Sequence, residues 1–169
     1  MPQINPPKYV RQILFGLQAR SHQAYLVGGC VRDVLMDITP QDWDICTSAL
    51  PEEVMSIFPG SEPTGIKHGT VTVSPKRADK GDTVTVKVGN RSAEVTTFRT
   101  DGSYRDHRRP ESVTFVSELI SDLSRRDFTM NAIALSADGM LSDPFDGVQA
   151  IRERTIRCVG DPMLRFNED

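Results

Sequence analysis

Cysteine is scarce in this chain of 169 residues, and its few copies form no pattern. Cys30, Cys46 and Cys158 are odd in number and far apart, and no Cys-x-x-Cys occurs. An odd, small number of scattered cysteines argues against a disulfide framework, and the lack of close cysteine pairs argues against a structural zinc site. We expect a reducing, cytoplasmic environment, in which Cys30 and Cys46 fill space among apolar neighbours.

Long apolar runs and an excess of positive charge are also missing. No run approaches the ~20 residues of a membrane-spanning helix, and the N-terminal segment lacks the basic-then-apolar pattern of a signal peptide, so we expect no membrane association. Lys and Arg total 20 against 23 Asp and Glu, a net charge of -3. Nucleic-acid binding would therefore depend on local basic clusters, such as the one at residues 105–109. With 38% hydrophobic and 25% charged residues, the composition suits one globular domain, with room for a small appendage.

Two carboxylates, Asp42 and Asp44, flank the single tryptophan, Trp43. On a strand, alternate side chains share a face, so the two acids would point one way and Trp43 the other. Neighbouring like charges are best tolerated with a cation between them, and carboxylate oxygens suit a Mg²⁺ ion that also holds substrate phosphates. Taken alone, such a pair is more often a solvated acidic turn, and the oxygen ligands of a calcium loop are absent.

A Gly28-Gly29 pair separates an expected strand at residues 24–27 from an expected helix at residues 30–36. Glycine lets the backbone approach a ligand closely, and Arg32 could add a forked contact to a phosphate. The G-x-G-x-x-G fingerprint of dinucleotide-binding proteins is missing, which excludes that class. A plain tight turn with a surface arginine remains the alternative.

Alternating β-branched residues predict strands at residues 68–73, 83–88 and 92–98, joined as an antiparallel meander. If the last of these lies beside the acidic strand, Glu94 becomes a third carboxylate at the same site. A plain surface position for Glu94 is equally consistent with the local sequence. Residues 75–88 form a long polar segment, which we interpret as an extended surface hairpin.

The remaining elements follow from periodicity and turn residues. Helices are expected at residues 9–19, 51–58 and 148–154, a polar loop at 99–112, a hairpin turn at Asp138-Gly139 and a strand at 155–159. In the stretch from Ser124 to Leu135, Arg126 could clamp a triphosphate and Asn131 could hydrogen-bond a ligand. The alternative is a helix with its arginines in solution.

Together these segments resemble the class II tRNA nucleotidyltransferases, which are the CCA-adding enzymes, and their bacterial poly(A) polymerase relatives. The resemblance spans residues 9–169 and rests on several motifs in the family's order. They are Gly28-Gly29-Cys30-Val31-Arg32-Asp33 with Asp42-Trp43-Asp44, Arg125-Arg126-Asp127-Phe128-Thr129-Met130-Asn131-Ala132, Asp143-Pro144-Phe145-Asp146-Gly147 and Glu168-Asp169.

The resemblance implies an α+β fold. Residues 1–146 would form a polymerase-β-like nucleotidyltransferase head with a mixed sheet and flanking helices. Residues 147–169 would begin a helical neck, and we expect the protein to continue beyond Asp169. Residues 104–110 fall where the family's flexible loop lies, which favours a CCA-adding or A-adding enzyme over one that adds only C.

The implied activity is Mg²⁺-dependent transfer of AMP, and of CMP, from ATP and CTP to the 3′ end of tRNA or another RNA. Asp42 and Asp44 would hold the metal, and Glu94 would help to activate the RNA hydroxyl. A small-molecule nucleotidyltransferase, a poly(A) polymerase and a non-catalytic nucleotide- or RNA-binding module remain alternatives. The residues that the resemblance implies for nucleotide binding are Gly28, Gly29, Arg32, Asp33, Arg126, Asp127, Asn131 and, for base selection, Asp169.

Overall fold

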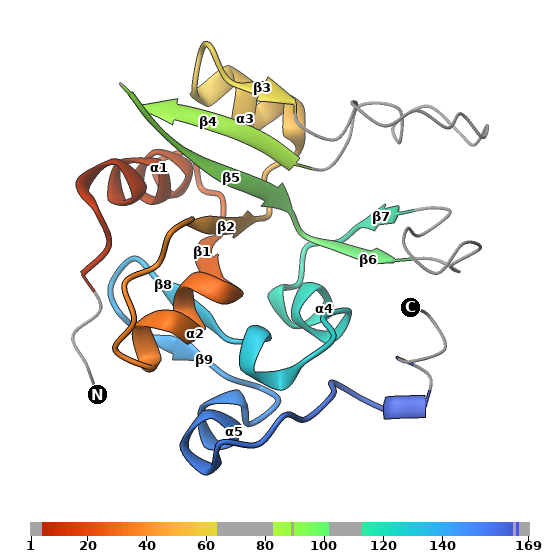
Figure 1. The fold of residues 1–169 in the computed structure, drawn as a ribbon. Helices are drawn as coiled ribbons and strands as arrows, with labels where there is room; N and C mark the ends of the chain where they lie inside the picture. The colour runs from red at the N-terminus through yellow and green to blue at the C-terminus, as the bar shows by residue number, and fades with distance from the viewer. Residues whose placement is uncertain (1–4, 64–82, 89, 102–112, 164, 166–169) are drawn as a thin grey trace.

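The computed structural model describes residues 5–63, 83–88, 90–101, 113–163 and 165 (Figure 1). Its helices are α1 (Lys8–Gln18), α2 (Gly29–Leu35), α3 (Pro51–Ile57), α4 (Leu119–Ser124), α5 (Gly147–Glu153) and the 3-10 helix η3 (Thr129–Asn131). Its strands are β1 (Ala24–Val27), β2 (Asp44–Thr47), β3 (Glu62–Pro63), β4 (Thr83–Val88), β5 (Arg91–Thr97), β6 (Arg99–Asp101), β7 (Val113–Phe115), β8 (Ala134–Ser136) and β9 (Leu141–Ser142). None of the described helices is both long and apolar enough to cross a membrane.

The main sheet is mixed, as predicted. Its strand order is β3-β4-β5-β2-β1-β8-β9, and β6 pairs with β7 in a separate sheet. Among these pairings β2 with β5 is parallel, and the others are antiparallel. A parallel pair needs a crossover connection, and here the chain between β2 and β5 supplies α3, β3 and β4.

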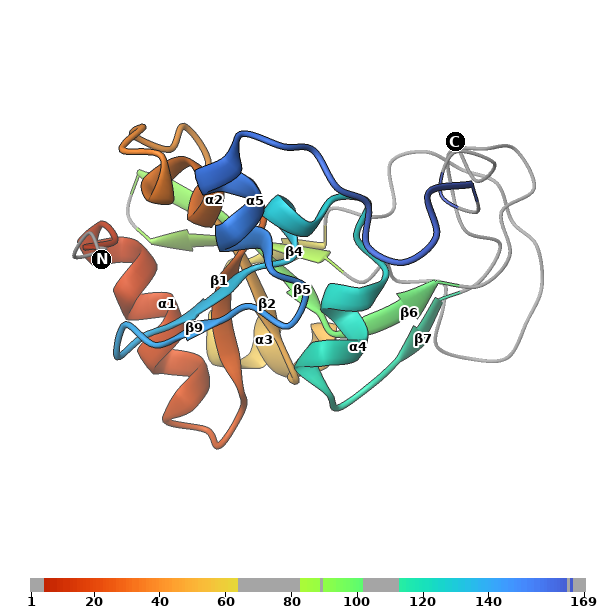
Figure 2. The same ribbon diagram turned by 90° about the horizontal axis from the view of Figure 1, so that it is seen from below.

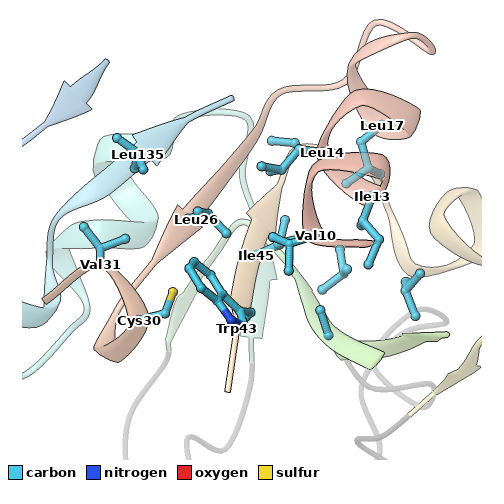
Figure 3. Packing of buried hydrophobic residues seen from close by; sticks show 14 of the residues in the cluster. Val10, Ile13, Leu14, Leu17, Leu26, Cys30, Val31, Trp43, Ile45 and Leu135 are labelled. Carbon is cyan, nitrogen blue, oxygen red and sulfur yellow. The ribbon is translucent and has the colours of Figure 1, made fainter. Parts of the chain in front are cut away.

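One face of the sheet packs against α1, α2 and α3. Helix α1 forms because its apolar residues recur every three to four positions, which buries one stripe completely. That stripe meets apolar side chains from neighbouring strands and the indole of Trp43, which is 8% exposed (Figure 3). The core on this face includes Val10, Ile13, Leu14, Leu17, Leu26, Val31, Trp43, Ile45, Val95 and Leu135.

The opposite face carries a smaller core beneath α4. Val27, Cys46 and Ala134 come from β1, β2 and β8, and they pack with Phe98 and Leu123. Figure 2 shows α1 and α4 on opposite sides of β1 and β2. Because side chains alternate along a strand, the face of β2 that carries Cys46 also carries Asp44.

Several sequence predictions hold. The helix expected at residues 9–19 is α1, the strand at 24–27 is β1, and the hairpin turn at Asp138-Gly139 joins β8 to β9. Strands at residues 83–88 and 92–98 correspond to β4 and β5, which pair antiparallel. Cys30 and Cys46 are buried, as fillers would be.

Other predictions are wrong. Asp42 precedes β2 rather than lying within it, because the strand begins at Asp44. Residues 99–101 form strand β6, which is paired along its length with β7, instead of an irregular loop. Residues 155–159 make one isolated bridge, from Cys158 to Phe128, rather than a strand. The expected strand at 68–73 and the turn at 75–82 lie outside the described residues.

The arginine-rich segment is not a helix exposed to solvent. After α4 it continues through the short η3 and enters β8. Burial of Ala132, Ile133, Ala134 and Leu135 on both faces of the sheet accounts for the unbroken apolar run. Short apolar runs of this kind do not distinguish a helix from a buried strand.

Candidate functional site

The acidic residues meet where β2 and β5 run side by side. Asp44 is the first residue of β2, and it pairs with Glu94 in the parallel register. Asp42 lies two residues earlier in the chain. All three carboxylates line a cavity of about 420 Å³, together with Trp43, Thr85, Ser92 and Ala93. The predicted adjacency of Glu94 to the acidic strand is therefore confirmed.

Burial of Trp43 orients the two acids. Its indole lies in the core near Cys30 and Ile45 (Figure 3). Because alternate residues of a strand share a face, Asp44 points away from the core that holds Trp43. Asp42 lies in a bend and lines the same cavity as Asp44. The predicted common direction of the acids thus survives, although Asp42 is not in the strand.

The carboxylates disfavour one another's charge. Partial burial raises the pKa of Asp44, Arg126 opposes that rise, and the charge of Asp42 adds to it. The pKa of Glu94 is also raised, first by burial and then by the charges of Asp44 and Asp42. A bound cation would relieve this repulsion.

The Gly28 turn lies directly beside this cluster. Gly28 has φ 76° and ψ −139°, a conformation that favours glycine. A β-carbon at this position would lie 3.3 Å from Nη1 of Arg126 and 4.0 Å from Oδ2 of Asp44. The structure thus brings together three motifs that are separated in sequence, namely the glycine turn, the acidic pair and the arginine segment.

Arg32 connects the first motif to the third. Its Nε and Nη2 donate to Oδ1 of Asp33 at 2.9 and 2.6 Å, and its Nη1 donates to Oδ1 of Asn131 at 3.0 Å. Asn131 ends η3, which packs against α2. The predicted residues Arg32, Asp33 and Asn131 therefore form one hydrogen-bonded group next to the Gly28-Gly29 turn.

Arg125 and Arg126 share a buried carboxylate, Asp122 in α4. Nε of Arg125 lies 3.0 Å from Oδ1, Nη2 of Arg126 lies 3.2 Å from Oδ2, and the Asp122 side chain is 0% exposed. The alternative that places both arginines in solution is therefore wrong. The sequence offered a signal for this residue, because Asp122 lies three and four positions before the arginines, the spacing of ion pairs on a helix.

Two predicted site residues are not drawn into this cluster. Asp127 is exposed, and its backbone carbonyl accepts a hydrogen bond from the Val159 N–H at 2.9 Å. Asp169 lies outside the described residues, as does the loop at 104–110.

The Asp143–Gly147 motif has a local structural role. Oδ1 and Oδ2 of Asp143 accept hydrogen bonds from the N–H groups of Gly147 and Val148 at 2.7 and 2.9 Å, which caps α5. Gly147 packs so tightly on η3 that a β-carbon there would lie 2.2 Å from the carbonyl oxygen of Thr129.

A divalent cation fits the donor set. Among the described residues no group of three or more His, Cys, Asp or Glu side chains converges as a ready-made metal cage. Mg²⁺ does not require one, since it is usually bound by one or two carboxylates together with water and substrate phosphates. Asp42 and Asp44 provide the two carboxylates, and Glu94 lies at the rim.

Comparisons with known proteins agree with this geometry. A family model described as the poly A polymerase head domain matches residues 24–157. A CCA-adding enzyme of Geobacillus thermodenitrificans is 54% identical over 157 residues, which is 93% of this chain and 36% of that protein. The chain therefore spans about a third of the length of such relatives.

Solved structures give the same result. A Bacillus stearothermophilus CCA-adding enzyme in complex with CTP superposes with a TM-score of 0.80 at 46% identity, covering 98% of this chain and 37% of that one. A Thermotoga maritima CCA-adding enzyme complexed with tRNA superposes with a TM-score of 0.65 at 26% identity, covering 98% and 35%. Because the family model matches well over half of the chain, this protein belongs to the poly A polymerase head domain family.

Proposed function

We propose that this chain is the catalytic head of an RNA 3′-nucleotidyltransferase, and that the protein that contains it adds CCA to tRNA. The observation that carries the proposal is the meeting of Asp44, Gly28 and Arg126 within a few ångströms. A solvated acidic turn would not need a positive-φ glycine and a half-buried arginine beside it. Relatives named as CCA-adding enzymes, one solved with CTP and one with tRNA, support tRNA as the acceptor and CTP as a donor. ATP as the donor of the final A is part of the proposal.

In this proposal Asp42 and Asp44 hold Mg²⁺. Their oxygens are the hard ligands that Mg²⁺ prefers, and a bound cation would reduce the repulsion between the two carboxylates. When bound, the metal would assist phosphoryl transfer by lowering the pKa of the attacking hydroxyl and neutralising charge on the phosphates. Glu94 lies next to Asp44 on the neighbouring strand, where it would accept the proton of the RNA 3′-hydroxyl.

The remaining residues would bind and orient the nucleotide. Gly28 and Gly29 leave the backbone open to close approach by phosphate oxygens, and Arg126 offers positive charge on the same side. Arg32, fixed by Asp33 and Asn131, would stand at the other side of the turn, with Asn131 toward the ribose. Asp127, which lies outside this group, stays a prediction from the resemblance. Phosphoryl transfer depends mainly on such positioning of charges.

The test is nucleotide addition by the full-length protein. With tRNA lacking its terminal CCA, CTP, ATP and Mg²⁺, we expect the wild type to extend the 3′ end. The double variant Asp42→Ala, Asp44→Ala should lose at least ~10³-fold in rate, as when the centre of charge stabilisation is removed. Full activity in that variant, or triphosphate binding indifferent to Mg²⁺ and to both acids, would instead indicate a non-catalytic binding module.

The same assay decides which nucleotides are added. We propose addition of both C and A, with Asp169 contributing to base selection. Sequencing the extended 3′ ends would separate CCA addition from addition of a single A and from untemplated poly(A). Extension by A alone would assign the protein to the A-adding or poly(A) branch of the family.

A further inference from the structure

We propose that Asp122 is a positioning residue, which fixes Arg126 against the Gly28 turn and so sets where the triphosphate is held. The inference rests on the proposed function, because it assumes that a nucleoside triphosphate binds at this turn. Asp122 does not line the acidic cavity, and it would act only through Arg126.

Asp122 is built into the molecule as a fully buried ion. Its side chain is 0% exposed, and its two oxygens receive Nε of Arg125 and Nη2 of Arg126. Oδ1 also receives the backbone N–H of Arg99 at 3.3 Å. A buried carboxylate persists only when it is paired and hydrogen-bonded, so this group links α4, the arginine pair and the start of β6.

The bond to Asp122 leaves one end of Arg126 directed at the site. Nη2 is bound to Asp122, whereas Nη1 lies next to Gly28 on the side of Asp44. The Nε atom is buried and has no hydrogen-bond partner among the described residues. An unpaired buried donor is costly, which indicates that the ion pair, rather than optimal local bonding, determines where this guanidinium lies.

The charges agree with this role. Arg126 opposes the rise in the pKa of Asp44, which shows that the positive charge of its guanidinium acts on the acidic site. A triphosphate entering between them would meet a guanidinium whose position is already set, which lowers the entropic cost of binding.

The experiment is a double-mutant cycle on the full-length protein. Four proteins are compared, namely the wild type, Asp122→Asn, Arg126→Ala and the double variant, with CTP binding in Mg²⁺ measured by calorimetry. We expect Asp122→Asn to weaken CTP binding by about 10- to 100-fold, the usual effect of removing a supporting residue at a metal site. In the Arg126→Ala background the same change should have little further effect.

Kinetics separate positioning from folding. We expect Asp122→Asn to raise KM for CTP while leaving KM for tRNA unchanged, which a general loss of structure would not do. Arg125→Ala is the matched control, since it removes the other ion pair of Asp122 but leaves Arg126 bound. We expect its KM for CTP to stay within about threefold of the wild type, because the bond between Arg126 and Asp122 remains. Should Asp122→Asn not fold, Asp122→Glu keeps the charge and moves the carboxylate, and it should show the same selective rise.

The outcomes are distinguishable. A wild type that fails to bind CTP would overturn the proposed function itself. A wild type that binds CTP, with Asp122→Asn or Asp122→Glu folded and unchanged, would overturn only the role of Asp122. Multiplicative losses in the double variant would also overturn it, because they would show that Asp122 acts independently of Arg126.

Discussion

At the scale of single residues, the carboxylates of the site are placed where their charges lower the stability of the fold. Burial and the charge of Asp42 raise the pKa of Asp44, and burial and the charges of Asp44 and Asp42 raise the pKa of Glu94. A fold selected for stability alone would separate them or replace one with a neutral side chain. Functional sites commonly retain such unfavourable charges, and substitutions that relieve them stabilise the protein while removing activity.

The first prediction concerns Asp44→Asn in the metal-free protein. The folded-state pKa of Asp44 is raised, so folding is opposed by its ionisation. The neutral substitute should therefore increase the melting temperature at pH 7 and remove any stabilisation by Mg²⁺. Asp138→Asn is the control, and we expect it to lower the melting temperature, because a hydrogen bond from Ser136 lowers the pKa of that exposed carboxyl. A lower melting temperature for Asp44→Asn would contradict the prediction.

The same shifts predict how stability depends on pH. The native state keeps its proton on Asp44 and Glu94 at pH values where the unfolded chain, with ordinary pKa values near 4, has lost it. As pH rises through that interval, the contribution of these two groups to the free energy of unfolding should fall. This loss can be measured by urea unfolding of the metal-free wild type and of the double variant Asp44→Asn, Glu94→Gln. The difference in stability between the two proteins should grow with pH and then level off.

At the scale of elements, short turns decide how the motifs meet. The turn between β1 and α2 depends on Gly28, and the start of α5 depends on Asp143 and Gly147. In each case the critical residue makes contact with a segment distant in sequence, Arg126 in the first and Thr129 in the second. Both contacts fall on the stretch between α4 and β8, which therefore organises the site.

The second prediction concerns Gly28→Ala. A side chain there would be strained by φ 76° and would press on Arg126. We expect a loss of ~1–3 kcal/mol in stability and a loss of CTP binding. Gly139→Ala is the matched control, since Gly139 has φ 88° but nothing within 4 Å of the added atom. That variant should lose similar stability and keep its CTP affinity; equal affinities in both variants would refute the role of the turn.

The third prediction concerns the cap of α5. Asp143→Ala removes two hydrogen bonds to the first N–H groups of this helix, and caps of this kind are worth ~0.5–2 kcal/mol. Chemical denaturation should show a loss in that range. Glu153→Ala, which breaks the exposed pair with Arg157 and an exposed hydrogen bond from Gln149, should change stability by less than ~0.5 kcal/mol. A smaller effect for Asp143→Ala than for Glu153→Ala would contradict the assignment.

At the scale of the whole molecule, a mixed sheet separates two cores. The larger core binds α1, α2 and α3, and the smaller one lies under α4. The acidic cavity is lined by Asp44 and Glu94, which belong to the face of the sheet that carries the smaller core. A parallel pair in an otherwise antiparallel sheet is what places Asp44 next to Glu94.

The fourth prediction concerns the boundary between head and neck, which remains proposed at residue 146. Helix α5 buries Gly147 and Ala150 against η3 and α2, so it contributes to the head's core. We expect a chain ending at Asp146 to be less stable than one ending at Gly160 by several kcal/mol, because it would lose buried contacts. Equal melting temperatures would place α5 outside the folding unit of the head.

The fifth prediction concerns the 169-residue chain by itself. We expect it to bind CTP weakly with Mg²⁺ and to transfer nucleotides poorly, because it spans only about a third of the length of its CCA-adding relatives. Calorimetry and a primer-extension gel would measure the two properties. Efficient addition of CCA by this chain alone would contradict the expectation.

Much of this protein could be derived from the order of its residues. Periodicity located α1, β1, β4 and β5, because a fully apolar stripe or a strict alternation leaves few alternatives. The motifs around Gly28, Asp42 and Asn131 indicated the family, since their chemistry needs those residue types at those spacings. Prediction from local sequence failed where pairing between distant segments determines the structure. Strand β6 is an example, because it forms only where β7 lies beside it.

Tertiary structure alone decided how the motifs combine. Whether Glu94 lay on the surface or beside Asp44 depended on the pairing of β2 with β5, two strands far apart in the sequence, which no local pattern specifies. Whether Arg126 pointed into solvent or into the site depended on a buried partner, Asp122. Sequence determined which chemical groups were available, whereas burial and sheet register determined which of them meet, because those contacts exist only once distant segments pack together.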